Sequence, residues 1–167
     1  MSSNIKSSNN NIEIKPFART AFEVAETKRV APYLDSASAI GYYLGFLTYG
    51  LGPGYAFALF LDKKRKLLKT VKLKQDGLPI PESILDAIDS ELKDKRVKYF
   101  LVAHNHKDKP LVPSIDDRIT TDAITARYAK SSAEFIGHYI TSGFDYLLVK
   151  YDGQIDRCYK PRRRPTK

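Results

Sequence analysis

The feature that most constrains the fold is an apolar run that ends in two histidines. Residues 97–103 read VKYFLVA, which is typical of a buried strand, and His104 and His106 follow directly. In extended backbone, side chains two residues apart point to the same side, so both imidazoles can face one ion. We therefore expect a core strand whose end presents polar groups instead of more core.

The remaining segments predict alternating helices and strands. Helices are expected from Ser36, as N-cap, to about residue 46, from residues 81–82 to about 93, and from Ser114 onwards. Short apolar or alternating runs predict further strands at 55–61, 66–73, 135–140 and 146–151. The charged turn at 62–65 predicts a hairpin. This pattern favours an α/β (α+β) class with a mixed, mostly antiparallel sheet flanked by helices.

The helix that begins at Ser114 is predicted to have an apolar face. Ile115, Ile119, Ala123 and Ile124 recur at helical spacing, so we expect them to share one side of the helix.

Length and composition predict one domain between two polar tails. The chain has 167 residues, of which 43% are hydrophobic, enough for a single core. The Ser/Asn-rich start predicts a disordered tail over residues 1–16, followed by a domain over 17–157. Residues 158–167 form a basic tail with five positive charges and no acid. One cysteine, Cys158, and the absence of a secretory signal or a long apolar span favour a soluble, cytoplasmic protein.

The net charge of +9 indicates which kinds of partner the chain could attract. A basic surface and tail can attract polyanions, so weak nucleic-acid binding is one expectation, and a solvated basic surface is the simpler alternative. No membrane partner is expected.

A third metal ligand is expected just beyond the histidines. Catalytic zinc sites take three protein ligands and keep one position for water. Asp117 is the candidate, one turn into the helix that begins at Ser114, and Asp108 and Asp116 are alternatives. The segment from Ser114 to Asp117 also fits a capping box, which explains both residues without a metal.

His138 is the third histidine of the chain and lies in an apolar strand. We interpret it as a structural histidine. The histidine pair and the Ser/Asp pair together favour a metal site, which neither pair supports alone.

These residues resemble a known motif. The spacing His-x-His, seven residues, Ser, two residues, Asp is similar to the JAMM motif of JAB/MPN-domain metalloproteases, and His104, His106, Ser114 and Asp117 fit it without gaps. The surrounding sequence resembles the RadC-like branch over about residues 34–153. The resemblance implies the JAB/MPN, cytidine-deaminase-like architecture, and a link to DNA repair or mobile elements.

The resemblance also implies roles for these residues. His104, His106 and Asp117 would bind zinc, and Ser114 would act in catalysis by hydrogen bonding to a developing oxyanion. The reaction implied is hydrolysis of an amide or isopeptide bond. The family's glutamate, which transfers a proton from water to the leaving nitrogen, falls on Gly54 in this chain.

The missing glutamate leaves three hypotheses for function. The chain is a zinc metallohydrolase, a non-catalytic JAB/MPN-like module that binds a protein or peptide partner, or a protein that associates with nucleic acid.

Overall fold

In the computed structural model, the described residues are 31–52, 54–75, 82–106, 111–150 and 155–156. The helices among them are α2 (Ala37–Thr48), α3 (Glu82–Glu91) and α4 (Ile115–Tyr128). The strands are β1 (Tyr55–Leu61), β2 (Leu67–Gln75), β3 (Tyr99–Asn105), β4 (Glu134–Ser142), β5 (Asp145–Val149) and β6 (Ile155–Asp156). None of the described helices is long and apolar enough to cross a membrane.

The predicted tails at 1–16 and 158–167 lie outside the described residues, as do both predicted ends of the 17–157 domain. These boundaries stay predictions. Cys158 and Asp108 also lie outside the described residues.

The described strands form one mixed sheet in the order β2-β1-β3-β4-β5-β6. Only the central β3–β4 pair is parallel, and each other neighbouring pair is antiparallel. The predicted class, a mostly antiparallel mixed sheet flanked by helices, is therefore confirmed. The β1–β2 hairpin closes through Asp62, whose Oδ1 accepts hydrogen bonds from the backbone N–H groups of Lys64 and Lys66 at 2.8 and 3.0 Å.

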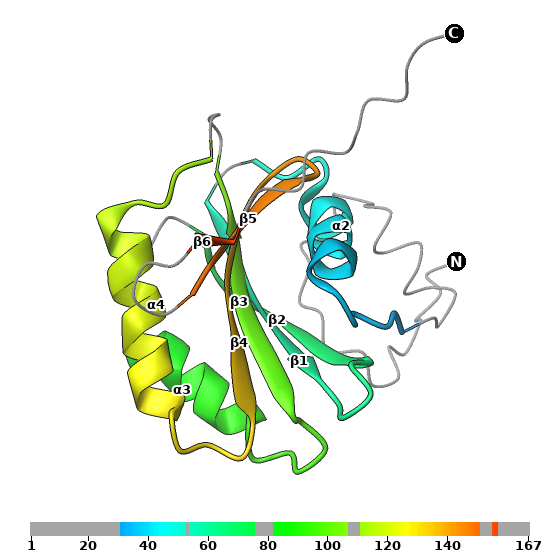
Figure 1. The fold of residues 1–167 in the computed structure, drawn as a ribbon, viewed down its shortest axis with the longest axis vertical. Coiled ribbons are helices and arrows are strands. Elements are labelled where there is room, and N and C mark those ends of the chain that lie inside the picture. The colour runs from blue at the N-terminus through cyan, green and yellow to red at the C-terminus, as the bar shows by residue number, and fades with distance from the viewer. Residues whose placement is uncertain (1–30, 53, 76–81, 107–110, 151–154, 157–167) are drawn as a thin grey trace, which may run out of the picture.

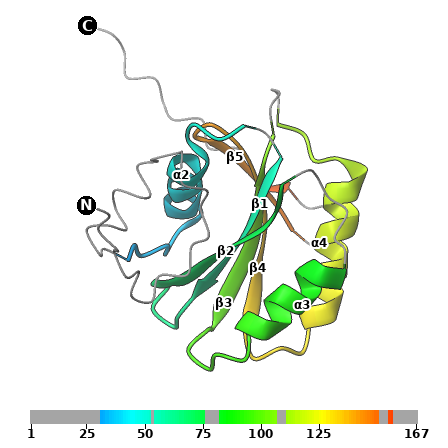
Figure 2. The same ribbon diagram turned by 180° about the vertical axis from the view of Figure 1, so that it is seen from behind.

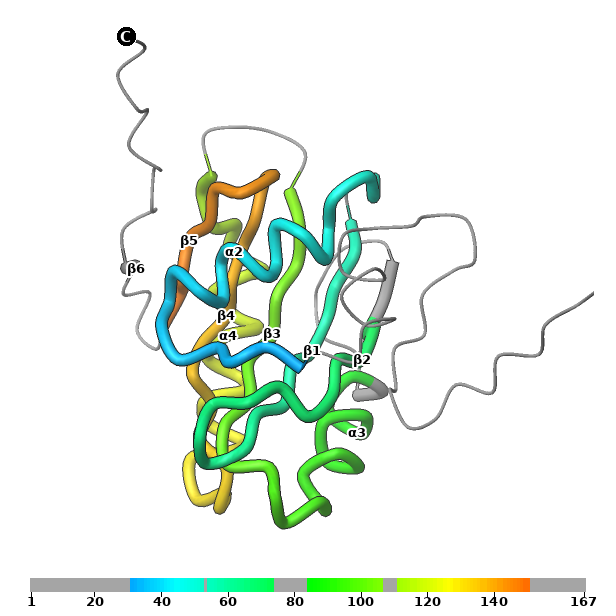
Figure 3. The backbone as a smooth tube through the Cα atoms, turned by 90° about the vertical axis from the view of Figure 1, so that its right-hand side faces the viewer, coloured from blue at the N-terminus to red at the C-terminus, as the bar shows by residue number. Residues whose placement is uncertain are grey.

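Helices cover both faces of the sheet, with α2 on one side and α3 and α4 on the other (Figures 1 and 2). Figure 3 looks onto the face that α2 covers. The central strand β3 supplies both layers, because its side chains alternate. Leu101 packs in the α2 layer, whereas Phe100 and Val102 pack in the layer beneath α3 and α4. The same alternation places His104 on the side of α4.

The start of α2 follows the sequence prediction. Ser36 is its N-cap, and the Ser36 hydroxyl oxygen accepts a hydrogen bond from the backbone N–H of Ala39 at 3.1 Å.

The prediction that the four apolar residues share one face of α4 is wrong, because only Ile124 is buried. Ile115 and Ile119 are 77% and 56% exposed, and Ala123 is exposed as well. The face that packs on the sheet is instead made of Asp117, Thr120, Thr121, Ile124 and Tyr128. Asp117 lies on this packed face with its carboxylate toward His104 of β3, whereas Ile115 and Ile119 lie on the side of the helix that faces solvent.

Candidate metal centre

The two histidines of the motif project from the end of β3. The strand begins and ends two residues later than the predicted 97–103, so His104 lies within it and pairs with Ile140 of β4. His106 follows the strand, and its backbone N–H donates to the Thr141 carbonyl at 2.7 Å. The extended backbone therefore continues through both histidines. Their rings lie on one side, with centroids 4.6 Å apart, as the i, i+2 spacing predicts.

Asp117 completes the group from the first turn of α4. Its Oδ2 accepts a hydrogen bond from the backbone N–H of Ser114 at 2.7 Å, and the Ser114 hydroxyl oxygen accepts from the Asp117 N–H at 3.1 Å. The capping box is thus present. Asp117 Oδ1 also lies 3.2 Å from His104 Nε2, and Oδ2 lies 3.7 Å from His106 Nε2. One carboxylate serves both the helix cap and the histidine pair, so the two explanations of this segment are compatible.

The facing atoms converge on one point. His104 Nε2 lies 2.7 Å from His106 Nε2, and both face the carboxylate of Asp117. Zinc bound to nitrogen and oxygen at about 2.0–2.2 Å holds its ligand atoms roughly 3 Å apart. The separations of 2.7–3.7 Å are on this scale, so the three side chains fit a metal ion. Asp116, one of the alternatives from the sequence, is exposed on α4.

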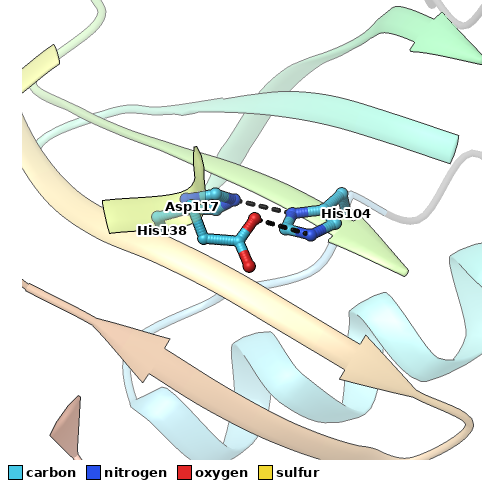
Figure 4. Close-up of side chains that lie close together, drawn as sticks. All are labelled: His104, Asp117 and His138. Atoms are coloured by element: carbon cyan, nitrogen blue, oxygen red, sulfur yellow. Dashed lines mark hydrogen bonds and ion pairs between the residues drawn. The ribbon is translucent and has the colours of Figure 1, made fainter. Parts of the chain in front are cut away.

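His138 of β4 stands behind His104. It is fully buried, and its Nε2 lies 2.7 Å from His104 Nδ1 (Figure 4). Its Nδ1 lies 3.1 Å from the Thr121 hydroxyl oxygen. His104, Asp117 and His138 make a buried group that could hold a metal ion, with ligand atoms within 4.8 Å of one another.

Sequence reasoning missed the contact between His138 and His104. A lone histidine in an apolar strand was a signal of a buried polar contact, but the sequence did not show which strands are neighbours. The parallel pairing of β3 with β4 places His138 opposite Val102, and so on the same face as His104.

The electrostatics of the group favour a cation. Burial lowers the pKa of His138 to about 3, and the nearby charge of His104 acts in the same direction. Burial alone would raise the pKa of Asp117, but the hydrogen bond and charge of His104, with the Ser114 backbone N–H, hold it well below its usual range. At neutral pH the group therefore combines a neutral His138 with an ionised carboxylate.

Among the described residues, no lysine or arginine pairs with Asp117. A buried carboxylate needs a positive partner. At His104 Nε2 this partner can be a proton or a metal ion.

The position that the resemblance assigns to the catalytic glutamate lies beside this group. In the β1–β3 register Ala56 stands opposite His104. Gly54, two residues earlier, lies just before β1 and next to the end of β3, where it hydrogen bonds to Asn105. Gly54 carries no side chain and adopts a φ of 90°, a conformation that favours glycine.

Asn105 ties the loop before β1 to this end of β3. Its Oδ1 accepts a hydrogen bond from the Tyr55 N–H at 2.8 Å, and its Nδ2 donates to the Gly52 carbonyl at 2.8 Å. The Gly54 N–H donates to the Asn105 carbonyl at 3.3 Å. The loop is therefore anchored next to the histidines, although it brings no carboxylate to them at residue 54.

Comparisons with known proteins identify bacterial relatives, although no protein-family model matches the chain. A UPF0758 protein of Burkholderia thailandensis is 28% identical over 145 residues, which cover 86% of this chain and 54% of the relative. A UPF0758 protein of Burkholderia mallei is also 28% identical over 145 residues, covering 86% of this chain and 51% of the relative. A UPF0758 protein of Janthinobacterium sp. is 28% identical over 125 residues, covering 74% and 55%. The chain spans about half the length of these curated relatives.

Proposed function

We propose that this chain is a RadC-like domain of the JAB/MPN fold that binds one zinc ion through His104, His106 and Asp117. The observation that carries the proposal is the convergence of two imidazole Nε2 atoms and one carboxylate, with separations of 2.7–3.7 Å, at the end of a buried strand. The similarity to UPF0758 proteins supports the same assignment, because UPF0758 is the RadC family.

The donor set favours zinc over the common hard cations. Two imidazoles and one carboxylate suit zinc, whereas magnesium and calcium prefer oxygen ligands throughout. Three protein ligands also leave a position for water, which is the arrangement of catalytic zinc sites.

The reaction that we propose is hydrolysis of an amide or isopeptide bond. A bound zinc ion would polarise the substrate carbonyl and lower the pKa of a coordinated water. Ser114 stands at the N-cap of α4 beside the ligands, and its oxygen accepts the Asp117 N–H. The hydroxyl proton of Ser114 stays available to donate to a developing oxyanion.

The glycine at position 54 limits this reaction. Without a carboxylate on that part of the sheet face, proton transfer depends on water or on a group outside the described residues. The loss of a positioned general base typically lowers the rate by about 100- to 10,000-fold. We therefore propose that hydrolysis by this chain alone is slow.

Gly54 also favours a second candidate function, a non-catalytic module that binds a protein or peptide partner through the same fold.

Weak nucleic-acid binding is a further expectation from the charge. Three basic side chains of the β1–β2 hairpin are already engaged within the chain: Lys69 pairs with Glu91 at 2.5 Å, and Arg65 and Lys72 lie over the rings of Tyr99 and Tyr55. Nucleic-acid binding that depends on the remaining charges should fall steeply with salt.

Zinc titration of the chelator-treated protein tests the metal assignment. We expect one zinc per chain by calorimetry and elemental analysis, lost in Asp117→Asn. Asp116→Asn is the matched control, because it removes the neighbouring but exposed carboxylate of the same helix turn and should leave stoichiometry unchanged. A wild-type chain that binds no zinc, or an Asp117→Asn variant that binds as tightly as wild type, contradicts the proposal.

Hydrolysis of fluorogenic peptide and isopeptide substrates then separates the two candidate functions. Gly54→Glu should raise the rate of the zinc-loaded protein, and Gly52→Glu, in an exposed position of the same loop, should not. Because the φ of Gly54 disfavours other residues, circular dichroism and zinc stoichiometry must first show that the variant folds. Zinc binding with no hydrolysis by wild type or by a folded Gly54→Glu favours the binding module.

A further inference from the structure

A line of hydrogen bonds runs from α4 through His138 of β4 to the Nδ1 atom of His104. The Thr121 hydroxyl donates to the Asp117 backbone carbonyl at 2.7 Å. The same oxygen lies 3.1 Å from His138 Nδ1, and His138 Nε2 lies 2.7 Å from His104 Nδ1. All these atoms belong to buried residues, so water competes little for them.

The Thr121 hydroxyl determines which atom donates in each of these hydrogen bonds. A hydroxyl has one proton, and a carbonyl oxygen can only accept. If the Thr121 proton pointed to His138 instead, two oxygen atoms would face each other at 2.7 Å with no proton between them. Thr121 therefore donates to the carbonyl and accepts from His138, which places the His138 ring proton on Nδ1.

The positions of the ring protons on His138 and His104 follow from this assignment. A neutral imidazole has one N–H, so a proton on His138 Nδ1 leaves a lone pair on Nε2. That lone pair accepts from His104 Nδ1–H across 2.7 Å. His104 then directs its Nε2 toward His106 and the Asp117 carboxylate. The lowered pKa of His138 is consistent with the single ring proton that this arrangement requires.

We propose that Thr121 and His138 are positioning residues that fix the ring orientation and tautomer of His104, so that His104 binds zinc through Nε2 while His138 is not a ligand. Both nitrogens of His138 are engaged, one by Thr121 and one by His104, so neither is left for an ion at His104 Nε2. This inference rests on the proposed zinc site. Groups that hold the second nitrogen of a metal-bound histidine typically contribute 10- to 100-fold to metal affinity.

Nitrogen-15 NMR of the histidine rings in the wild-type protein tests the tautomer without any substitution. In the metal-free protein at neutral pH, we expect the single proton of His138 on Nδ1. After addition of zinc, the coordination shift should fall on His104 Nε2 and leave His138 Nε2 unshifted. A His138 proton on Nε2, or a coordination shift at His138, overturns the proposal even if zinc is bound.

Zinc affinity of variants tests the positioning role. Thr121→Val removes the hydroxyl and should weaken zinc binding by about 10- to 100-fold, while Thr121→Ser should retain near wild-type affinity. Thr125→Val is the matched control. Thr125 makes the same 2.7 Å bond to the carbonyl four residues earlier, that of Thr121, but its hydroxyl is not part of the line from Thr121 through His138 to His104. Equal affinity of Thr121→Val and wild type overturns the proposal.

Substitution of His138 separates a positioning residue from a ligand. A glutamine can accept from His104 and donate to Thr121, so His138→Gln should bind zinc more tightly than His138→Leu. Equal loss in both variants, with folding intact, contradicts the positioning role. A wild-type chain without zinc binding refutes the proposed function instead, while the ring proton of metal-free His138 still tests the direction of the hydrogen bonds.

Discussion

Helix α4 carries a polar cluster near each end, and the two clusters differ in their positive partners. Near the end of the helix, the carboxylate of Asp89 from α3 lies 2.5 Å from the Arg127 guanidinium and accepts from the Tyr128 hydroxyl at 2.8 Å. Near the start, the partners of Asp117 among the described residues are imidazoles and a backbone N–H.

In one cluster the carboxylate is already balanced by an arginine, and in the other it is not. Asp89 has a permanent positive partner, because arginine stays protonated at any ordinary pH. Asp117 is more deeply buried, and its side-chain neighbours are imidazoles and not a permanently charged guanidinium, so a metal ion on the imidazoles would balance its charge. Similar residue types thus produce a structural contact at one end of α4 and a candidate binding site at the other.

The largest expected effect is on zinc affinity. Asp117→Asn removes a proposed ligand and should weaken zinc binding by more than about 100-fold, beyond the typical effect of groups that only hydrogen bond to a ligand. The same change at the other cluster, Asp89→Asn, should leave zinc affinity within about twofold. Competition with a chromophoric chelator measures both. Comparable losses in the two variants would remove the distinction between the clusters.

The second-largest expected effect is on the pH dependence of the free energy of unfolding, which should differ between the two clusters. The pKa of His138 is lowered from 6.5 to about 3 in the folded chain, so the unfolded chain binds more protons between these values. The metal-free protein should therefore lose stability as the pH falls below about 6.5. Asp117 adds to this loss only below its ordinary pKa of 3.8, where its lowered folded pKa makes protonation favour unfolding.

Urea denaturation at several pH values, with chelator present, measures this dependence. His138→Gln should flatten the curve between pH 6.5 and 4. Asp89→Asn should not, because the hydrogen bond with Arg127 lowers the pKa of Asp89 from 3.8 and its contribution changes only in more acidic solution. A wild-type curve that is flat from pH 6.5 to 4 would contradict the buried neutral histidine.

A smaller effect is expected for Tyr128→Phe. The Tyr128 hydroxyl contacts Asp89 at 2.8 Å and the Leu85 carbonyl at 3.1 Å. Its loss should lower the free energy of unfolding by about 1 kcal/mol. Zinc affinity should stay unchanged, because Asp89 keeps Arg127. Urea denaturation and zinc titration of the same sample check both parts, and a change in zinc affinity would show that the two clusters are coupled.

The smallest effect is expected on the outer face of α4. Ile119→Ala should change the free energy of unfolding by no more than about 0.5 kcal/mol, since Ile119 is 56% exposed. Ile124→Ala, at a fully buried position of the same helix, should cost about 2–5 kcal/mol. Thermal or urea denaturation compares the pair. Equal losses in the free energy of unfolding would mean that Ile119 is as buried as Ile124 and would contradict the observed rotation of α4.

Local patterns determined much of this protein. Strand β1 has the predicted bounds, α2 begins at the predicted cap, and the capping box of α4 is present. The spacing alone also predicted that His104 and His106 share one side of the strand. These features depend on backbone geometry and on hydrogen bonds between residues a few positions apart, which a sequence shows directly.

Tertiary structure decided the features that depend on distant partners. The pairing of β3 with β4 brought His138 against His104, 34 residues apart in the chain. The packing of α4 on the sheet buried Asp117, Ile124 and Tyr128 and left Ile119 exposed. Strand order and helix rotation are set by packing and polar contacts across the whole domain. The motif spacing therefore predicted the candidate ligands, and only the fold showed which groups hold them in place.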